Sequence, residues 1–164
     1  MRHIISVLLE NESGALSRVA GLFSARGYNI ESLTVAPTND PTLSRMTIVT
    51  NGDERKIDQI EKHLNKLVDV AALQDITAGS HLEREVVLAK LVANTEQKAD
   101  LDKIVVAFNA RLITVSDSQF IVEMSGSSEK VDELLKSMNG ITILELARSG
   151  VTGLSSDETA LTVA

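Results

Sequence analysis

One order of strand and helix patterns occurs twice along this chain, and this repeat constrains the fold more than any other sequence feature. The first half begins with an alternating strand pattern at residues 4–9 and continues with apolar residues at helical spacing up to Gly27. Strand patterns at 28–36 and 43–50, joined by a turn, predict an antiparallel hairpin. A second helical pattern and a strand at 68–76 complete the order βαββαβ.

The second half repeats this order after a short polar stretch. A strand at 86–92 and a helix precede a hairpin of residues 112–115 and 120–124, and a further helix and a strand at 141–147 follow. We therefore predict an α+β fold with two ferredoxin-like βαββαβ domains in tandem. The expected boundaries are residues 1–77 for the first domain, 78–82 for a linker, 83–150 for the second domain and 151–164 for a flexible tail.

The amino-acid composition excludes several kinds of functional site and argues against some kinds of partner. Hydrophobic residues make up 43% of the chain and aromatic residues only 2%, so the core must consist of aliphatic side chains. There is no Cys, which excludes disulfides, thiolate metal sites and cysteine nucleophiles, and which favours the cytoplasm as the compartment. The formal net charge of −7 argues against a nucleic-acid partner. The start of the chain lacks the pattern of a signal peptide, and no apolar run reaches the roughly 20 residues that span a membrane.

The first strand has apolar residues on both faces. Ile5 and Val7 share one face, and Ile4 and Leu8 lie on the other. A domain of about 70 residues is near the small end of what folds alone, so an apolar face opposite the helices needs a cover. We expect another domain or a second copy of the chain to supply it, and thus an oligomer.

The loop 11–14 is the most informative candidate site. It leads from the first strand into the N-terminus of a helix, whose first amides have no intrahelical acceptor and therefore favour an anion. Gly14 allows a carboxylate to approach closely, and the Asn11 side chain can donate or accept a hydrogen bond. An α-amino acid would use both kinds of group. The simpler interpretation is that the loop is only a turn and that Ser13 caps the helix.

A longer stretch around this loop resembles a known family. Residues 6–50, SVLLENESGALSRVAGLFSARGYNIESLTVAPTNDPTLSRMTIVT, closely resemble the N-terminal ACT domain of acetohydroxyacid synthase small subunits. ACT domains share the βαββαβ order and a loop N-x-x-G after the first strand, and GYNIESLTVAPT at 27–38 looks like the small-subunit signature. The second half is similar at HLEREVVLAKL and ELARSG, but its turn at 109–111 lacks the family's Gly.

The resemblance implies an amino-acid effector site between two copies of the chain. In this family the ligand lies between the loop of one chain and the start of the second strand of its partner. Carried over to this sequence, the effector-binding residues are Asn11, Gly14, Ala15 and Leu16 facing Asn29 and Ile30, with Ser17 able to shape the pocket.

The resemblance also implies a regulatory role and a catalytic partner. The chain would form a homodimer, activate the large catalytic subunit of acetohydroxyacid synthase in branched-chain amino-acid biosynthesis, and confer feedback inhibition by valine. Thiamine diphosphate, Mg²⁺ and FAD are expected in that catalytic subunit, and no cofactor, metal or catalytic residue is expected in this chain. The effector's identity among valine, leucine and isoleucine does not follow from the residues.

Two alternative functions would use the same type of fold. A free-standing ACT-type amino-acid sensor would use the same loop without a catalytic partner, but the chain lacks a helix-turn-helix pattern for direct control of DNA. A ferredoxin-fold enzyme or RNA binder is disfavoured because the strands lack paired aromatics and no catalytic constellation is present. His3, His63 and His81 are far apart in the sequence.

Overall fold

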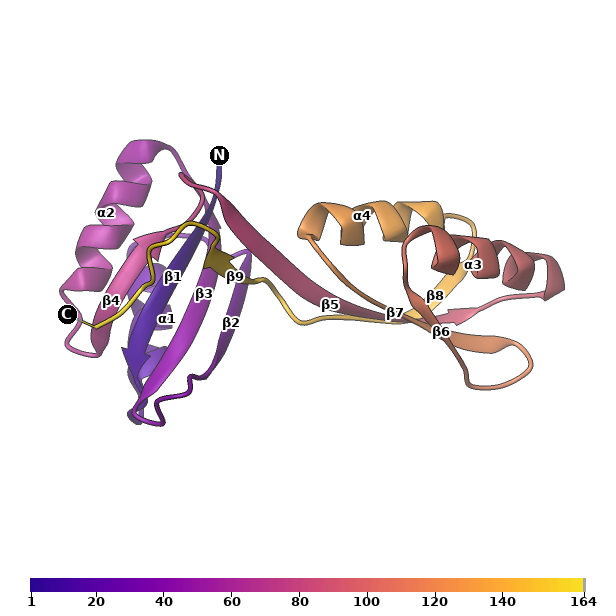
Figure 1. Cartoon of the computed structure of the whole chain (residues 1–164), viewed down its shortest axis with the longest axis horizontal. Helices are drawn as coiled ribbons and strands as arrows, with labels where there is room; N and C mark the ends of the chain where they lie inside the picture. The colour runs from indigo at the N-terminus through magenta and orange to yellow at the C-terminus, as the bar shows by residue number, and fades with distance from the viewer. Residues whose placement is uncertain (164) are drawn as a thin grey trace. The chain divides into compact units, whose positions relative to one another are not determined.

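The computed structural model describes residues 1–163, which divide into two compact units. The first unit contains Met1–Leu82 together with the C-terminal segment from Val151, and the second contains Glu83–Gly150. Both have the predicted α+β architecture of helices on an antiparallel sheet (Figure 1).

The first unit contains a four-stranded sheet with strand order β2-β3-β1-β4. Strand β1 is central and pairs antiparallel with β3 and β4, whereas β2 lies at an edge and pairs only with β3 on this path. The elements are β1 (Arg2–Glu10), α1 (Ala15–Ala25), β2 (Ser32–Pro37), β3 (Leu43–Asn51), α2 (Glu54–Asn65) and β4 (Val70–Asp75).

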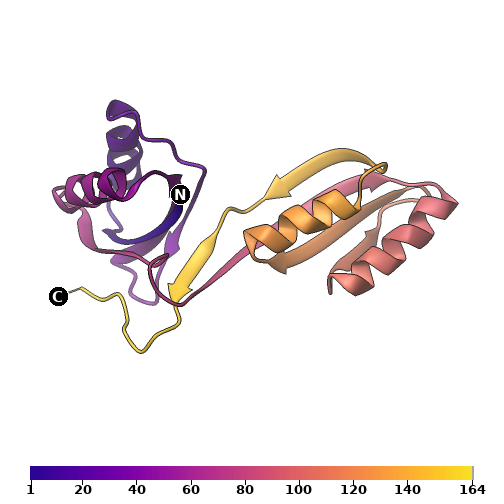
Figure 2. The same ribbon diagram turned by 90° about the horizontal axis from the view of Figure 1, so that it is seen from above.

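Strand alternation explains the core of this unit. Ile5, Val7 and Leu9 point to the same face of β1 and pack with Phe23 of α1 and Leu64 of α2. All of these side chains are buried, and each contributes roughly 1.5 to 3 kcal/mol by leaving water. The two helices therefore cover one face of the sheet, as Figure 2 shows.

The second unit repeats this arrangement. Its sheet has the order β6-β7-β5-β8, and alternate residues of β5 face a core that Leu101 of α3 and Leu134 of α4 complete. The helices α3 and α4 lie on the same side of this sheet (Figure 2). The elements are β5 (His81–Val92), α3 (Thr95–Ala107), β6 (Arg111–Thr114), β7 (Gln119–Gly126), α4 (Ser128–Ser137) and β8 (Thr142–Arg148). The tandem fold predicted from the sequence is confirmed.

The C-terminal segment differs from the flexible tail expected at 151–164, the last residue of which lies outside the described part. Residues Thr152–Ser155 form strand β9, which pairs with β5. Val151 is 2% exposed and forms a small core with Ile4, Val49 and Ile76. Because side chains alternate along a strand, Val151 and Gly153 are buried on one side. The segment is too short for its sequence pattern to predict this strand.

This segment also supplies the cover that was expected from another domain or a second copy. Ile4 and Leu8, on the face of β1 opposite the helices, are 0% and 6% exposed within one chain. The Arg45 guanidinium donates to the Gly153 carbonyl oxygen at 3.0 Å and to Ser6 Oγ at 2.9 Å, which ties the segment to the same face. The open-face argument for an oligomer is therefore wrong.

Several predicted boundaries also change. The linker predicted at 78–82 is shorter, because β5 already begins at His81 and pairs with β9. The second strand begins at Ser32 rather than at residue 28, because the Tyr28 ring packs edge-on against Phe23, with ring centroids 5.8 Å apart, and leaves the strand path.

The packing of Gly153 leads to a stability prediction. A Cβ at this position would lie 2.9 Å from Ile76 Cδ1 and 3.2 Å from the Leu82 carbonyl oxygen. We expect Gly153→Ala to lower the free energy of unfolding by about 1 to 3 kcal/mol through overpacking, as measured by urea denaturation. Gly79→Ala is the control, because its Cβ would meet only Asp157 Oδ2 at 3.9 Å. Equal stability of the two variants would contradict the packing of the C-terminal segment.

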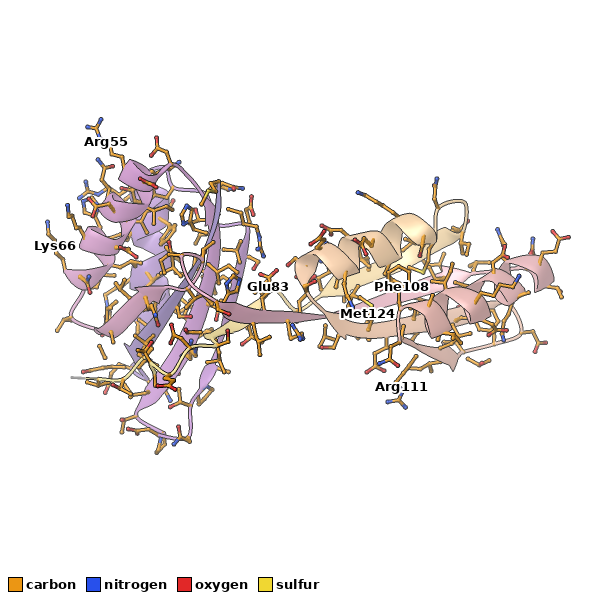
Figure 3. The ribbon with its side chains drawn as sticks, turned by 45° about the horizontal axis from the view of Figure 1, so that its top comes forward. Arg55, Lys66, Glu83, Phe108, Arg111 and Met124 are labelled. Atoms are coloured by element: carbon orange, nitrogen blue, oxygen red, sulfur yellow. The ribbon has the colours of Figure 1, made fainter. Side chains whose placement is uncertain are left out.

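Helix α2 presents a charged face to solvent. Arg55 on α2 and Lys66 at its end are exposed and point outward (Figure 3). The Asp53 side chain caps the helix by accepting from the Lys56 amide. Among the described helices, none is both long and apolar enough to cross a membrane.

Candidate functional site

The N-terminus of α1 has no side-chain cap. Its N-cap residue is Gly14, with φ 85° in the left-handed region, and no side-chain capping bond is present within residues 1–163. The other three described helices are capped by the side chains of Asp53, Asn94 and Ser127. The expectation that Ser13 caps α1 is therefore wrong, and the first amides of α1 have no side-chain acceptor among the described residues.

Backbone hydrogen bonds hold the loop that precedes α1. The Asn11 amide donates to the Thr42 carbonyl oxygen at 2.8 Å, and the Asn11 Nδ2 donates to the Pro41 carbonyl oxygen at 3.2 Å. The Ala15 amide donates to the Glu12 carbonyl oxygen at 3.3 Å, a long bond for a backbone pair. The Asn11 side chain is thus oriented by the turn between β2 and β3, and its Oδ1 remains an acceptor.

A cavity of about 260 Å³ lies at this helix N-terminus. Three of the predicted effector residues, Asn11, Ala15 and Leu16, line it together. The complete lining is Leu9, Glu10, Asn11, Glu12, Ala15, Leu16, Val35, Ala36, Pro37 and Ser44. The cavity therefore combines helix amides and carboxylates with an apolar wall.

The other predicted residues do not line this cavity. Gly14 is next to it as the N-cap, and Ser17 is exposed on α1. Asn29 accepts a hydrogen bond on its carbonyl oxygen from Thr50 Oγ1 at 2.6 Å, and Ile30 packs against the core of the first unit. Within one chain, the structure does not bring Asn29 and Ile30 to the loop.

Sequence reasoning missed the far wall of the cavity. Leu9 of β1 is paired with Ser44 of β3, and Ser44 is paired with Pro37 of β2. This register places three residues that are distant in the sequence side by side. Strand alternation alone did not identify them, because the register across three strands depends on the turn at 38–42.

The electrostatic surroundings suit a small zwitterion. The N-terminus of α1 carries a partial positive charge from its backbone amides. The exposed residues Glu10 and Glu12 border the same cavity. In the turn between β2 and β3, outside the lining of this cavity, hydrogen bonds from the Thr42 hydroxyl and amide lower the pKa of Asp40. The cavity thus has the partial positive charge of a helix N-terminus and two acidic residues on its border, which suits a ligand with a carboxylate and an ammonium group.

A larger groove of about 830 Å³ lies on the opposite face of the same sheet. It is bordered by Leu8, Arg45 and residues 161–163 of the C-terminal segment. None of the predicted effector residues lines it. In the described part of the chain, no group of three or more His, Cys, Asp or Glu side chains is arranged to hold a metal ion.

Comparison with known families covers both units. Residues 5–72 match a family model described as an AHAS small subunit-like ACT domain. Residues 84–157 match a model described as the small subunit of acetolactate synthase. Together these matches span most of both βαββαβ units.

Curated relatives match over nearly their whole length. The acetolactate synthase isozyme 3 small subunit of Escherichia coli is 55% identical over 156 residues, which cover 94% of this chain and 96% of the relative. The protein of the same name from Salmonella typhimurium is 54% identical over the same shares. The crystal structure of the acetolactate synthase small subunit from Thermotoga maritima is similar with a TM-score of 0.87 and 33% identity, covering 97% of this chain and 99% of that one.

Proposed function

This chain belongs to the acetolactate synthase small-subunit family, and from that premise we propose that it binds a branched-chain amino acid, valine in the first place, and thereby controls its catalytic subunit. It is a regulatory subunit without a catalytic site of its own, and its partner is the catalytic subunit. In the proposed mechanism the chain raises the activity of that subunit, and bound valine lowers it.

The cavity at the uncapped N-terminus of α1 carries this proposal. The carboxylate of valine would accept hydrogen bonds from the first amides of α1 near Gly14, Ala15 and Leu16. Its ammonium group would lie toward the Asn11 Oδ1 and the Glu10 carboxylate. Its apolar side chain would contact Leu16 and the wall formed by β2.

A second copy of the chain would complete the site. Leu16 and Val35 border the cavity and are 42% and 37% exposed, so apolar surface beside it remains uncovered. Strand β2 lies at the edge of the sheet, and an edge strand suits pairing with another chain. A homodimer formed there would bring Asn29 and Ile30 of the second copy toward the loop, as the family resemblance implies.

Regulation requires that valine binds two states of the complex with different affinity. Coupling of this kind is typically about 1 to 3 kcal/mol, which corresponds to roughly 5- to 150-fold changes in affinity. Thiamine diphosphate, Mg²⁺ and FAD remain expectations for the catalytic subunit, and the proposed location of the complex is the cytoplasm.

The first experiment is an activity assay with the cognate catalytic subunit. Acetolactate formation from pyruvate is measured with and without this chain, and valine is then titrated into the mixture. We expect the chain to raise the activity of the catalytic subunit and valine to lower it. Each effect should saturate as the concentration of the chain or of valine rises. Equal activity with and without the chain would contradict activation, and would leave the free-standing amino-acid sensor as the better function if isothermal titration calorimetry still detects valine binding.

A further inference from the structure

Arg18 and Asp69 form a bidentate ion pair beside the candidate site. Arg18 lies in the first turn of α1, and Asp69 lies in the segment between α2 and β4. The Arg18 Nε donates to Asp69 Oδ2 at 2.5 Å and the Arg18 Nη2 donates to Asp69 Oδ1 at 3.1 Å. Two parallel bonds of this kind fix the orientation of both side chains as well as their distance.

The two residues contact both ends of the loop that carries Asn11 and Gly14, Asp69 through its backbone and Arg18 through its side chain. At one end, the Asp69 carbonyl oxygen accepts from the Glu10 amide at 2.8 Å. At the other end, the Arg18 Nη2 donates to the Ser13 carbonyl oxygen at 3.3 Å. The Arg18 guanidinium also lies directly over Gly14, where a Cβ would be 2.9 Å from Nη1.

Separating Arg18 from Asp69 would cost free energy, because the Asp69 carboxylate is buried and charged. Asp69 is 5% exposed, so its carboxylate depends on the guanidinium for compensation. The hydrogen bond from Arg18 lowers the pKa of Asp69, and the same bond raises the pKa of Arg18. Both groups are therefore ionised at neutral pH. In the described chain Asp69 has no other cation as a partner in an ion pair.

We propose that Arg18 and Asp69 are positioning residues for the effector, and that their ion pair holds the loop 11–14 in the shape that presents the first amides of α1. This inference rests on the proposed function, because it concerns the same site. The two residues act through the loop. Asp69 does not line the cavity, and neither does Arg18.

The direction in which Asp69→Asn changes the dissociation constant of valine distinguishes a positioning role from direct contact with the ligand. If Arg18 bound the effector's carboxylate, Asp69→Asn would release its guanidinium from competition and strengthen binding. If the pair positions the loop, the same change weakens binding, because a neutral amide accepts only one charge-assisted bond and the loop loses its anchor. The two roles therefore predict opposite shifts in the dissociation constant of valine.

The test uses the full-length chain and isothermal titration calorimetry with valine. We expect Asp69→Asn to raise the dissociation constant roughly tenfold or more. Arg18→Lys, which keeps the charge and loses the planar fork, should weaken binding similarly. Asp58→Asn is the matched control, because Asp58 makes an exposed ion pair with Lys62 on α2 and should leave the dissociation constant unchanged.

Hydrogen exchange at the Glu10 amide adds a readout that a general loss of stability would not reproduce. Valine should slow exchange of this amide in the wild-type chain, because bound valine would hold the loop that follows Glu10. This added protection should be lost in Asp69→Asn, although the backbone carbonyl that accepts from the amide is retained. If the wild-type chain binds valine and Asp69→Asn binds it with the same or a lower dissociation constant, the positioning role is wrong and the proposed function is unaffected. Absence of valine binding to the wild-type chain would overturn the proposed effector and this inference with it.

Discussion

Gly14→Asp is expected to abolish the response of the catalytic subunit to valine while leaving activation by this chain in place. The new carboxylate would lie at the end of α1, where the proposed ligand places its own carboxylate, and like charges at one site repel. Gly14 also has φ 85°, a conformation that L residues rarely adopt, so the substitution adds backbone strain of roughly 1 to 2 kcal/mol. The half-inhibitory concentration of valine should therefore rise beyond the measurable range in the acetolactate assay.

The same substitution should disturb the loop. A Cβ at residue 14 would lie 2.9 Å from Arg18 Nη1, so the guanidinium must move, and the new carboxylate would compete with Asp69 for it. Because the Arg18 guanidinium compensates the buried Asp69 carboxylate, this movement should cost stability, and the left-handed backbone at residue 14 adds strain. We expect a loss of about 1 to 3 kcal/mol in the free energy of unfolding.

Gly21→Asp provides the matched control for charge. Gly21 lies on the same helix, is exposed and has no atom within 4 Å of its Cβ position. This variant adds the same charge away from the N-terminus of α1, and the catalytic subunit should therefore still be inhibited by valine as with the wild-type chain. If Gly14→Asp and Gly21→Asp were inhibited alike, the effector site would not be at the N-terminus of α1.

Arg148→Met is expected to cause a large loss of stability in the second unit. Glu85 is 4% exposed, and its carboxylate accepts from the Arg148 Nε at 2.6 Å and from Ser128 Oγ at 3.2 Å. Arg148 also donates from Nη1 to Asp132 at 2.9 Å. Removing the guanidinium leaves a buried carboxylate without its cation, which typically costs about 3 to 5 kcal/mol. Because the Arg148 side chain is one-third exposed, we expect about 2 to 4 kcal/mol.

The measurement is urea denaturation of the full chain, with hydrogen exchange at residues 83–150 to locate the loss in the second unit. Lys90→Met is the control, because the ion pair between Lys90 and Glu145 is mostly exposed and should contribute less than 1 kcal/mol. The double variant Glu85→Met with Arg148→Met should recover part of the loss, because no charge is then left buried. A loss below about 0.5 kcal/mol in Arg148→Met would show that Glu85 finds other compensation.

Part of the candidate site was predictable from the sequence. The N-x-x-G loop before a helical pattern indicated an anion site, and Asn11, Ala15 and Leu16 do share a cavity. Val35, Ala36 and Ser44 were missed, because their place beside the loop depends on strand register rather than on any local pattern. The Arg18–Asp69 pair was missed for a related reason, since a charged residue on a helix has many conceivable partners until the fold selects one.

Local chain chemistry was sufficient for the fold of each half. Alternating and helical apolar spacing determined the order βαββαβ twice, because these periods decide which side chains share a face before any long-range contact forms. Only the tertiary structure decided what covers the face of β1 that carries Ile4 and Leu8. Val151 and Gly153 belong to a segment too short to form a stable strand alone, and they become ordered through contacts with residues more than 70 positions earlier in the sequence.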